Sequence, residues 1–232
     1  MPVGIKSAVG DMDIWDDLAR LMDDRQRGVD FITIDGGEGG TCAAPLIFSD
    51  AVALPVRLGF ARVYRTFAQA GLTDDITFIG SGKLGVPENA FVALALGCDI
   101  LHVAREAMLA IGCIQAQKCH TDHCPTGIAT QNPWLTSGLD PELKAVRLAN
   151  YLNTLRRDLI QVSEAVGVWH PGLVSADDIE LVTEMREATS VRDTYGYERG
   201  WGQPGPAIRA EIETIMKALA SPEERDPQHA PR

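Results

Sequence analysis

Four apolar segments in the first half of the chain lead through loops, most of them glycine-rich, into helical patterns. Each segment is predicted to be a strand buried on both faces. Successive strand–loop–helix units indicate a parallel sheet with crossover helices, and four such units match half of a (β/α)8 TIM barrel, whose eight units need roughly 250 residues. The expected strands span residues 2–9, 30–37, 76–82 and 99–105.

Apolar residues with the spacing of a helix follow two of these strands. A helix is expected after the first strand, with Asp11 as a plausible cap, and another over about 87–96. The apolar face predicted for the first of these helices consists of Ile14, Leu18, Leu21 and Met22.

The second half of the chain has a different pattern. Residues 141–167 are predicted to form one long amphipathic helix, and a short helix is expected near 206–219. Ser175 with Asp178 resembles a capping box that opens another short helix. The polar end, 221–232, is expected to be disordered. The apolar face predicted for the long helix consists of Leu152, Leu155, Leu159, Val162 and Val166.

Charge and hydropathy argue against several partners and locations. The chain has 32 acidic and 21 basic residues and no basic stripe, which disfavours nucleic acid or an anionic membrane as a partner. The longest apolar stretch, 90–113, contains Asp99, His102 and Arg105, which are costly inside a bilayer. We therefore expect it to be helix, buried strand and helix. With no secretory signal at the start and an odd number of cysteines, a cytoplasmic, reducing compartment is expected.

Three of the five cysteines lie close together in CIQAQKCHTDHCPTG. Cys113, Cys119 and Cys124 follow the spacing C-x5-C-x4-C. A zinc site completed by His120 or His123, a disulfide, and three unligated thiols are the alternatives to an iron–sulfur cluster. The cluster is favoured, and three thiolates with no evident fourth ligand suit a cluster with three irons.

Two loops at strand ends carry glycines that suit close contact with a ligand. IDGGEGGTCAAP follows the second strand, and its four glycines allow the backbone to approach a flat or anionic group. GSGKLG follows the third strand, where backbone N–H groups and Lys83 would suit a phosphate. Tight turns with no ligand are the alternative for both loops.

Together these stretches resemble the FMN- and iron–sulfur-containing synthase domain of glutamate synthases. The resemblance runs from about residue 2 to about 135, and in the short FMN-binding members of the family it extends through the long helix. It implies a TIM barrel with FMN at its C-terminal mouth and a 3Fe–4S cluster beside it. The segments that carry it are PVGIK, FITIDGGEGGT, IGSGKLG and, most specifically, GCIQAQKCHTDHCPTGIATQNP.

The resemblance implies an oxidoreductase of the glutamate synthase type. In the family, ammonia derived from glutamine and 2-oxoglutarate give 2-iminoglutarate, which reduced FMN converts to L-glutamate. Electrons come from ferredoxin or NAD(P)H through a partner and the iron–sulfur cluster, which suits single-electron relay. The implied partners are thus small-molecule substrates and an electron donor.

Individual residues receive roles from the same resemblance. Lys6 would lie near flavin and substrate as the catalytic cation, although a solvated lysine after a strand is the alternative. Cys113, Cys119 and Cys124 would ligate the cluster. The expected flavin-binding residues are Gly36, Gly37, Gly39 and Gly40 along the ring, and Gly82, Lys83, Ala104 and Arg105 at the phosphate.

The chain departs from the family pattern in two respects. Cys42 stands where the family usually has glycine, which would cost about 1–2 kcal/mol if the position needs a positive φ. The first strand resembles the fifth of a barrel, so a polypeptide supplying strands one to four is expected, from a longer gene or a separate chain. Two copies closing on each other is less consistent with barrel register.

The expected organisation has three parts. A half-barrel with its Fe–S loop spans 1–135, a helical extension of the same domain spans 136–190, and a turn-rich tail spans 191–232. Two other functions remain open from the residues alone. One is a non-catalytic electron-transfer or scaffold subunit that keeps only the cluster, and the other is a related flavoenzyme acting on a different imine or α-keto acid.

Overall fold

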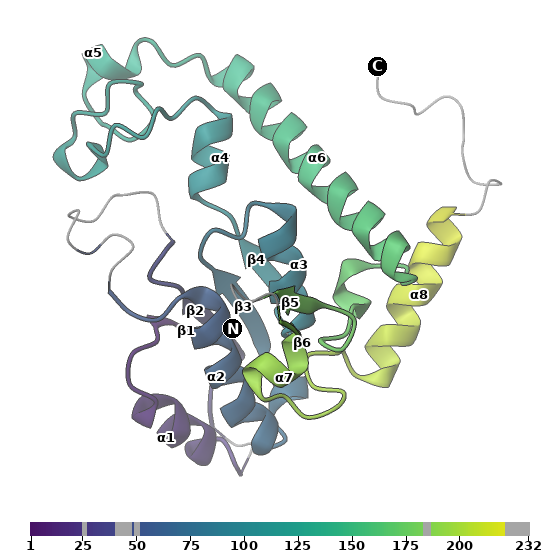
Figure 1. Cartoon of the computed structure of the whole chain (residues 1–232). Helices are drawn as coiled ribbons and strands as arrows, with labels where there is room; N and C mark the ends of the chain where they lie inside the picture. Colours follow the sequence, from purple (N-terminus) through teal and green to yellow (C-terminus); the bar gives the residue numbers. More distant parts are fainter. Residues whose placement is uncertain (25–26, 40–47, 49–51, 183–186, 221–232) are drawn as a thin grey trace.

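Four parallel strands form the centre of the fold in the computed structural model, which describes residues 1–24, 27–39, 48, 52–182 and 187–220 (Figure 1). The strands lie side by side in chain order, each pairing in parallel with the next. All four expected strands are therefore confirmed, and the arrangement fits one half of a TIM barrel. They are β1 (Gly4–Ala8), β2 (Phe31–Asp35), β3 (Thr77–Ser81) and β4 (Ile100–His102).

The prediction that the strands are buried on both faces is correct for the two central strands and wrong for the outer two. Ile32, Ile34 and Phe78 in β2 and β3 are at most 1% exposed. Each of β1 and β4 has a single strand neighbour within the described residues, and Ile100 of β4 remains 48% exposed. An edge strand of an open parallel sheet has the same apolar composition as a central one, so composition alone does not distinguish them.

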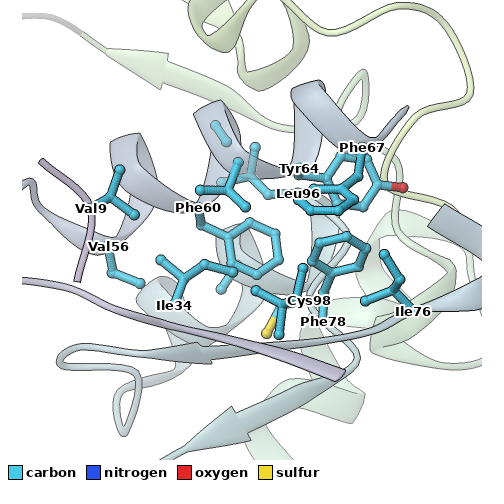
Figure 2. Packing of buried hydrophobic residues seen from close by; sticks show 14 of the residues in the cluster. Val9, Ile34, Val56, Phe60, Tyr64, Phe67, Ile76, Phe78, Leu96 and Cys98 are labelled. Atoms are coloured by element: carbon cyan, nitrogen blue, oxygen red, sulfur yellow. The ribbon is translucent and has the colours of Figure 1, made fainter. Parts of the chain in front are cut away.

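Aromatic rings pack between the sheet and the helices that follow its strands (Figure 2). Phe78 lies among three of them, with ring centroids 5.1 Å from Tyr64, 5.9 Å from Phe67 and 6.1 Å from Phe60. Large buried rings contribute apolar area and specific edge contacts, so this cluster is the main stabilising core. The helices are α1 (Asp13–Leu21), α2 (Val56–Gln69) and α3 (Pro87–Ala95).

The predicted apolar face of α1 is partly wrong. Trp15 and Ala19 are buried with Met22, whereas Ile14 and Leu21 are more than half exposed. Trp15 is the largest side chain of the helix, and burying it rotates α1 so that the neighbouring aliphatic residues point outward. The cap differs slightly as well, because the Asp11 carboxylate accepts a hydrogen bond from Asp13 N (3.0 Å) while Met12 occupies the N-cap position.

Cys98 belongs to the core, between α3 and β4. Its sulfur accepts a hydrogen bond from Gly80 N and donates one to Ile100 O, both at 3.0 Å. Burial raises the pKa of this thiol to about 12, although the Gly80 hydrogen bond opposes the shift. Cys98 therefore remains protonated in the folded protein at neutral pH.

Stability is expected to fall as the pH rises above about 9, because unfolded chains release the Cys98 proton while folded chains retain it up to about pH 12. The slope contributed by this thiol is about 1.4 kcal/mol per pH unit. Urea unfolding at about pH 8 and about pH 10 measures the loss. Cys98→Ser keeps a hydrogen-bonding group that does not ionise in this pH range, so the variant should lose less stability than the wild type. An equal loss of stability in the variant would contradict the attribution of the effect to Cys98.

The rest of the chain consists of short elements and one long helix. An antiparallel pair of strands, absent from the sequence expectations, forms where the capping box was expected to open a helix. Ser175 N does donate to Asp178 Oδ2 (2.9 Å), but a turn and a strand follow. The elements are α4 (Arg105–Ala110), α5 (Pro133–Thr136), α6 (Pro141–Val166), β5 (Glu180–Val182), β6 (Ala188–Ser190), α7 (Val191–Tyr195) and α8 (Pro206–Ala220), with 3-10 turns η2 (Thr73–Asp75), η3 (Cys119–Thr121) and η4 (Pro171–Leu173).

The long helix α6 is confirmed almost to the residue and runs past α4 and α3 (Figure 1). Its buried face consists of Leu155, Leu159 and Ser163, so two predicted members are right. Leu152, Val162 and Val166 lie on its exposed side, because only a narrow stripe of this helix contacts α3 and η4. Helix α8 confirms the last expected helix, while the predicted disorder of 221–232 falls outside the described residues.

No helix in the described part of the chain combines the length and apolar character needed to cross a bilayer.

Candidate functional site

Polar side chains gather at the C-terminal ends of the four strands. Directly paired residues of parallel strands point to the same face, and the register pairs Ala8 with Asp35, Asp35 with Ser81 and Ser81 with His102. These residues therefore form one row across the inner face, opposite the aromatic core. Lys6 lies one row below on the same face of β1. The row marks the edge where parallel barrels carry their active sites.

Lys6 and Asp35 form an ion pair at this edge, between the Lys6 ammonium and Asp35 Oδ2. Both side chains remain partly exposed, at 49% and 38%, so solvent screens the pair and it contributes little to stability. Its effect is on geometry, because the carboxylate holds the ammonium beside a cavity of about 420 Å³. The residues lining that cavity are Lys6, Asp35, Ser81, Leu101, His102, Val103 and Ala104.

Three polar residues of the cavity were missed from the sequence: Asp35, Ser81 and His102. Each is the last residue of its strand. Because side chains at the carboxyl ends of parallel strands converge, strand position alone was a sufficient signal for all three. The residues predicted there from the sequence are instead the glycines that follow these strands.

The glycines after β2 pack against neighbouring backbone. Gly36 N donates to Ser81 O (2.7 Å), and a Cβ on Gly36 would lie 2.6 Å from Val56 N. A Cβ on Gly39 would lie 2.9 Å from the Cα of Gly82, and one on Gly37 would meet the Val52 carbonyl oxygen at 2.5 Å. The loop therefore needs glycine to fit against the adjoining loops. Gly40 and Cys42, both named from the sequence, lie outside the described residues.

The loop after β3 approaches that packed backbone from the other side. Gly82 has φ +144° and Lys83 φ +51°, both in the region that favours glycine. Arg105, the first residue of α4, donates from Nη2 to Gly39 O (3.1 Å). That bond joins the loops after β2 and β4, so Gly39, Gly82 and Arg105 come together, and Ala104 lines the cavity next to them.

The three clustered cysteines lie on a long connection between α4 and α5, away from the sheet (Figure 1). Cys113 follows α4, and its sulfur accepts a hydrogen bond from Gln115 N (3.3 Å). Cys119 begins η3, and Cys124 is buried to 6% exposure. None of the four described cysteines is in a disulfide. Within the described residues, no three His, Cys, Asp or Glu side chains converge in an arrangement that could hold a metal ion.

Cys124 is surrounded by hydrogen-bond donors. Burial alone would raise its pKa, but the Thr126 hydroxyl and the backbone N–H groups of Ala129, Thr126 and Ile128 stabilise the thiolate and bring the pKa down to about 7. The Thr126 Oγ1 lies 3.3 Å from the sulfur. A thiol that ionises near neutrality, with N–H donors directed at sulfur, has the chemistry of a metal ligand.

The chain is similar to one known family and to several known proteins. A model described as "Conserved region in glutamate synthase" matches residues 13–169. A "Glutamate synthase large subunit-like protein YerD" of Bacillus subtilis (strain 168) is 41% identical over 73% of the chain and 32% of that relative. An "Archaeal glutamate synthase [NADPH]" of Methanocaldococcus jannaschii is 38% identical over 60% of the chain and 27% of that relative. The chain thus spans about a third or less of the length of these relatives.

Proposed function

Because this chain belongs to the glutamate synthase family, we propose that it forms the flavin- and cluster-bearing half of a catalytic domain that reduces 2-iminoglutarate to L-glutamate. The observation that carries this proposal is the row of polar strand-end residues beside a cavity of about 420 Å³, next to the packed glycine loops. The same family membership makes 2-oxoglutarate and glutamine-derived ammonia the proposed substrates.

The strand-end cavity is the proposed position of FMN. Ala104 lines this cavity and is small enough to leave room for the group. Lys83, in the loop after β3, and Arg105, at the start of α4, are cations that would suit its phosphate. Gly36, Gly37, Gly39 and Gly82 would form the wall of the site through their backbone, and Gly40 is proposed with them. When bound, the flavin would supply hydride transfer, which no amino-acid side chain provides.

Lys6 is proposed to bind and orient the substrate. Its ammonium lies at the cavity, so it would attract a substrate carboxylate, and Asp35 restricts where that ammonium can lie. Ser81 and His102 add donors on the opposite side of the same row. Such a row can fix the orientation of an anionic, planar imine without taking part in its covalent chemistry.

Cys113, Cys119 and Cys124 are the proposed ligands of a three-iron cluster. Their thiol chemistry fits, since Cys124 ionises near neutrality and the sulfurs of Cys113 and Cys124 already accept hydrogen bonds. When bound, the cluster would supply single-electron transfer from a donor such as ferredoxin or NAD(P)H acting through a partner protein.

Completion of the barrel by a polypeptide that carries the other strands is part of the proposal. Two observations support it: Ile100 of the outer strand β4 is 48% exposed, and the chain covers about a third of its relatives. A sheet edge and an apolar face left open favour association with another sheet.

Flavin and iron content tests the proposed function. We expect the chain, purified anaerobically together with the other half of the barrel, to carry both FMN and iron and to form glutamate from 2-oxoglutarate and ammonia with a reductant. Iron without flavin in that assembly would support the electron-transfer or scaffold function instead. A colourless protein that contains zinc would contradict both.

A further inference from the structure

Asp122 lies between the second and third clustered cysteines in an unusual backbone conformation. Its φ of +61° and ψ of +18° place it in the left-handed region at the end of η3. Aspartate and asparagine enter this region more readily than other residues with a side chain, because their short polar groups form local hydrogen bonds. The chain therefore reverses direction at Asp122, between Cys119 and Cys124.

The Asp122 carboxylate joins this turn to a segment eight and nine residues further on. Its Oδ1 accepts hydrogen bonds from Gln131 N (2.6 Å) and from Thr130 Oγ1 (2.9 Å). Thr130 Oγ1 is also 2.6 Å from the Asp122 carbonyl oxygen. We call these contacts of Asp122 with Thr130 and Gln131 the clamp. It closes the loop that contains Cys124 and its hydrogen-bond donors.

The clamp continues into α5. Asn132 N donates to Thr130 Oγ1 (3.1 Å), and the Asn132 side chain caps α5 by accepting from Trp134 N (2.9 Å). Gly127, with φ +74°, packs so closely on α5 that a Cβ there would lie 2.4 Å from Leu135 O. The segment from η3 to α5 is thus held by its own polar contacts.

The connection between Cys113 and Cys119 differs from the clamped segment in its backbone conformation. Gln115 and Gln117, which lie between Cys113 and Cys119, both have φ +54°. Neither residue has the local preference for this region that aspartate has, so the connection is strained in this arrangement. A change in the backbone dihedral angles of Gln115 and Gln117 would bring Cys113 to the other two thiols. The segment held by the clamp would keep its conformation.

We propose that Asp122 is a positioning residue, which through the clamp holds Cys119 and Cys124 ready to receive the cluster. This inference rests on the proposed function, because it concerns the cysteines assigned there as ligands. Outer residues that orient metal ligands typically change metal affinity roughly ten- to hundred-fold when they are lost. The hydrogen bonds that define the clamp join Asp122 to Thr130 and Gln131, so its effect on the cysteines would come through the loop backbone.

Asp122→Ala and Asp122→Asn test the proposal in the 232-residue chain. After anaerobic addition of ferrous iron and sulfide, cluster formation is followed by visible absorbance and electron paramagnetic resonance. We expect Asp122→Ala to need a roughly ten- to hundred-fold higher iron concentration than the wild type for half-maximal cluster formation. Asp122→Asn should restore the wild-type iron affinity, because asparagine accepts the same hydrogen bonds and tolerates the same φ. Asp17→Ala, at an exposed residue of α1, is the matched control.

A second measurement separates the clamp from general unfolding. In the metal-free chain the Gln131 amide should exchange slowly with deuterium in the wild type and in Asp122→Asn, and rapidly in Asp122→Ala. The cooperative unfolding transition should remain unchanged, because Asp122, Thr130 and Gln131 belong to neither apolar core cluster.

Two outcomes overturn the inference. If the wild type forms a cluster and Asp122→Ala forms it at the same iron concentration, Asp122 does not position the cysteines, and the proposed function stands. If the wild type binds iron in no form, even with the other half of the barrel, the proposed function fails and this inference fails with it.

Discussion

Cys119→Ser is expected to bind no iron–sulfur cluster after anaerobic reconstitution, whereas the wild-type chain becomes brown. The physical reason is the number of ligands: with three thiolates and no evident fourth, the loss of one leaves too few sulfur donors, and a serine hydroxyl is a poor substitute. Iron and sulfide analysis together with paramagnetic resonance measures the effect. The loop 113–127 should also become less ordered in the variant under conditions where the wild type holds its cluster.

Cys98→Ser is the matched control for this experiment. Cys98 is buried beside β3 and β4, and its sulfur is bonded to Gly80 N and Ile100 O, so its loss should leave the iron content unchanged. Wild-type iron content in Cys119→Ser would refute the ligand assignment. Equal iron loss in both variants would indicate damage to folding instead of loss of a ligand.

Phe78→Ala is expected to reduce the free energy of unfolding by about 3–5 kcal/mol. Phe78 is 1% exposed and packs against Phe60, Tyr64 and Phe67, so its truncation removes a large apolar contact and leaves a cavity between β3 and α2. Urea unfolding followed by circular dichroism measures the loss. The midpoint on heating should fall by roughly 10 °C for a domain of this size.

Val182→Ala provides the comparison, because Val182 is 71% exposed on β5. We expect that variant to differ from the wild type by about 0.5 kcal/mol or less. A loss in Phe78→Ala as small as that in Val182→Ala would mean that the aromatic cluster is not the centre of the stabilising core.

The strand pattern could be predicted because each strand is a short apolar run between loop residues. Burial against helices on one side requires that composition, so β2 and β3 follow from sequence alone. The buried face of α1 could not be predicted with the same certainty. Trp15 and Ile14 are adjacent and both apolar, and only the position of the sheet decides that Trp15 turns inward.

Some residues of the candidate site could be predicted from the sequence, but the contacts between them could not. Lys6 was identified from its place in the family motif, and the thiols from their spacing. The pairing of Asp35 with Lys6 depends on strand register, and the Asp122 clamp depends on a left-handed turn. Such contacts leave no local pattern, so the residues were visible in the sequence but their partners were not.

Helix α6 gives the molecule the properties of a lever. Its 26 residues correspond to a rigid rod about 39 Å long. The rod is seated on α3 and η4 through Leu155, Leu159 and Ser163, while its other end meets α4 and follows α5. A tilt of about 5° about that seat would move the far end, about 27 Å away, by roughly 2 Å. Small rearrangements beneath the seat would therefore be magnified at the thiol-bearing connection, without any bond in that connection having to break.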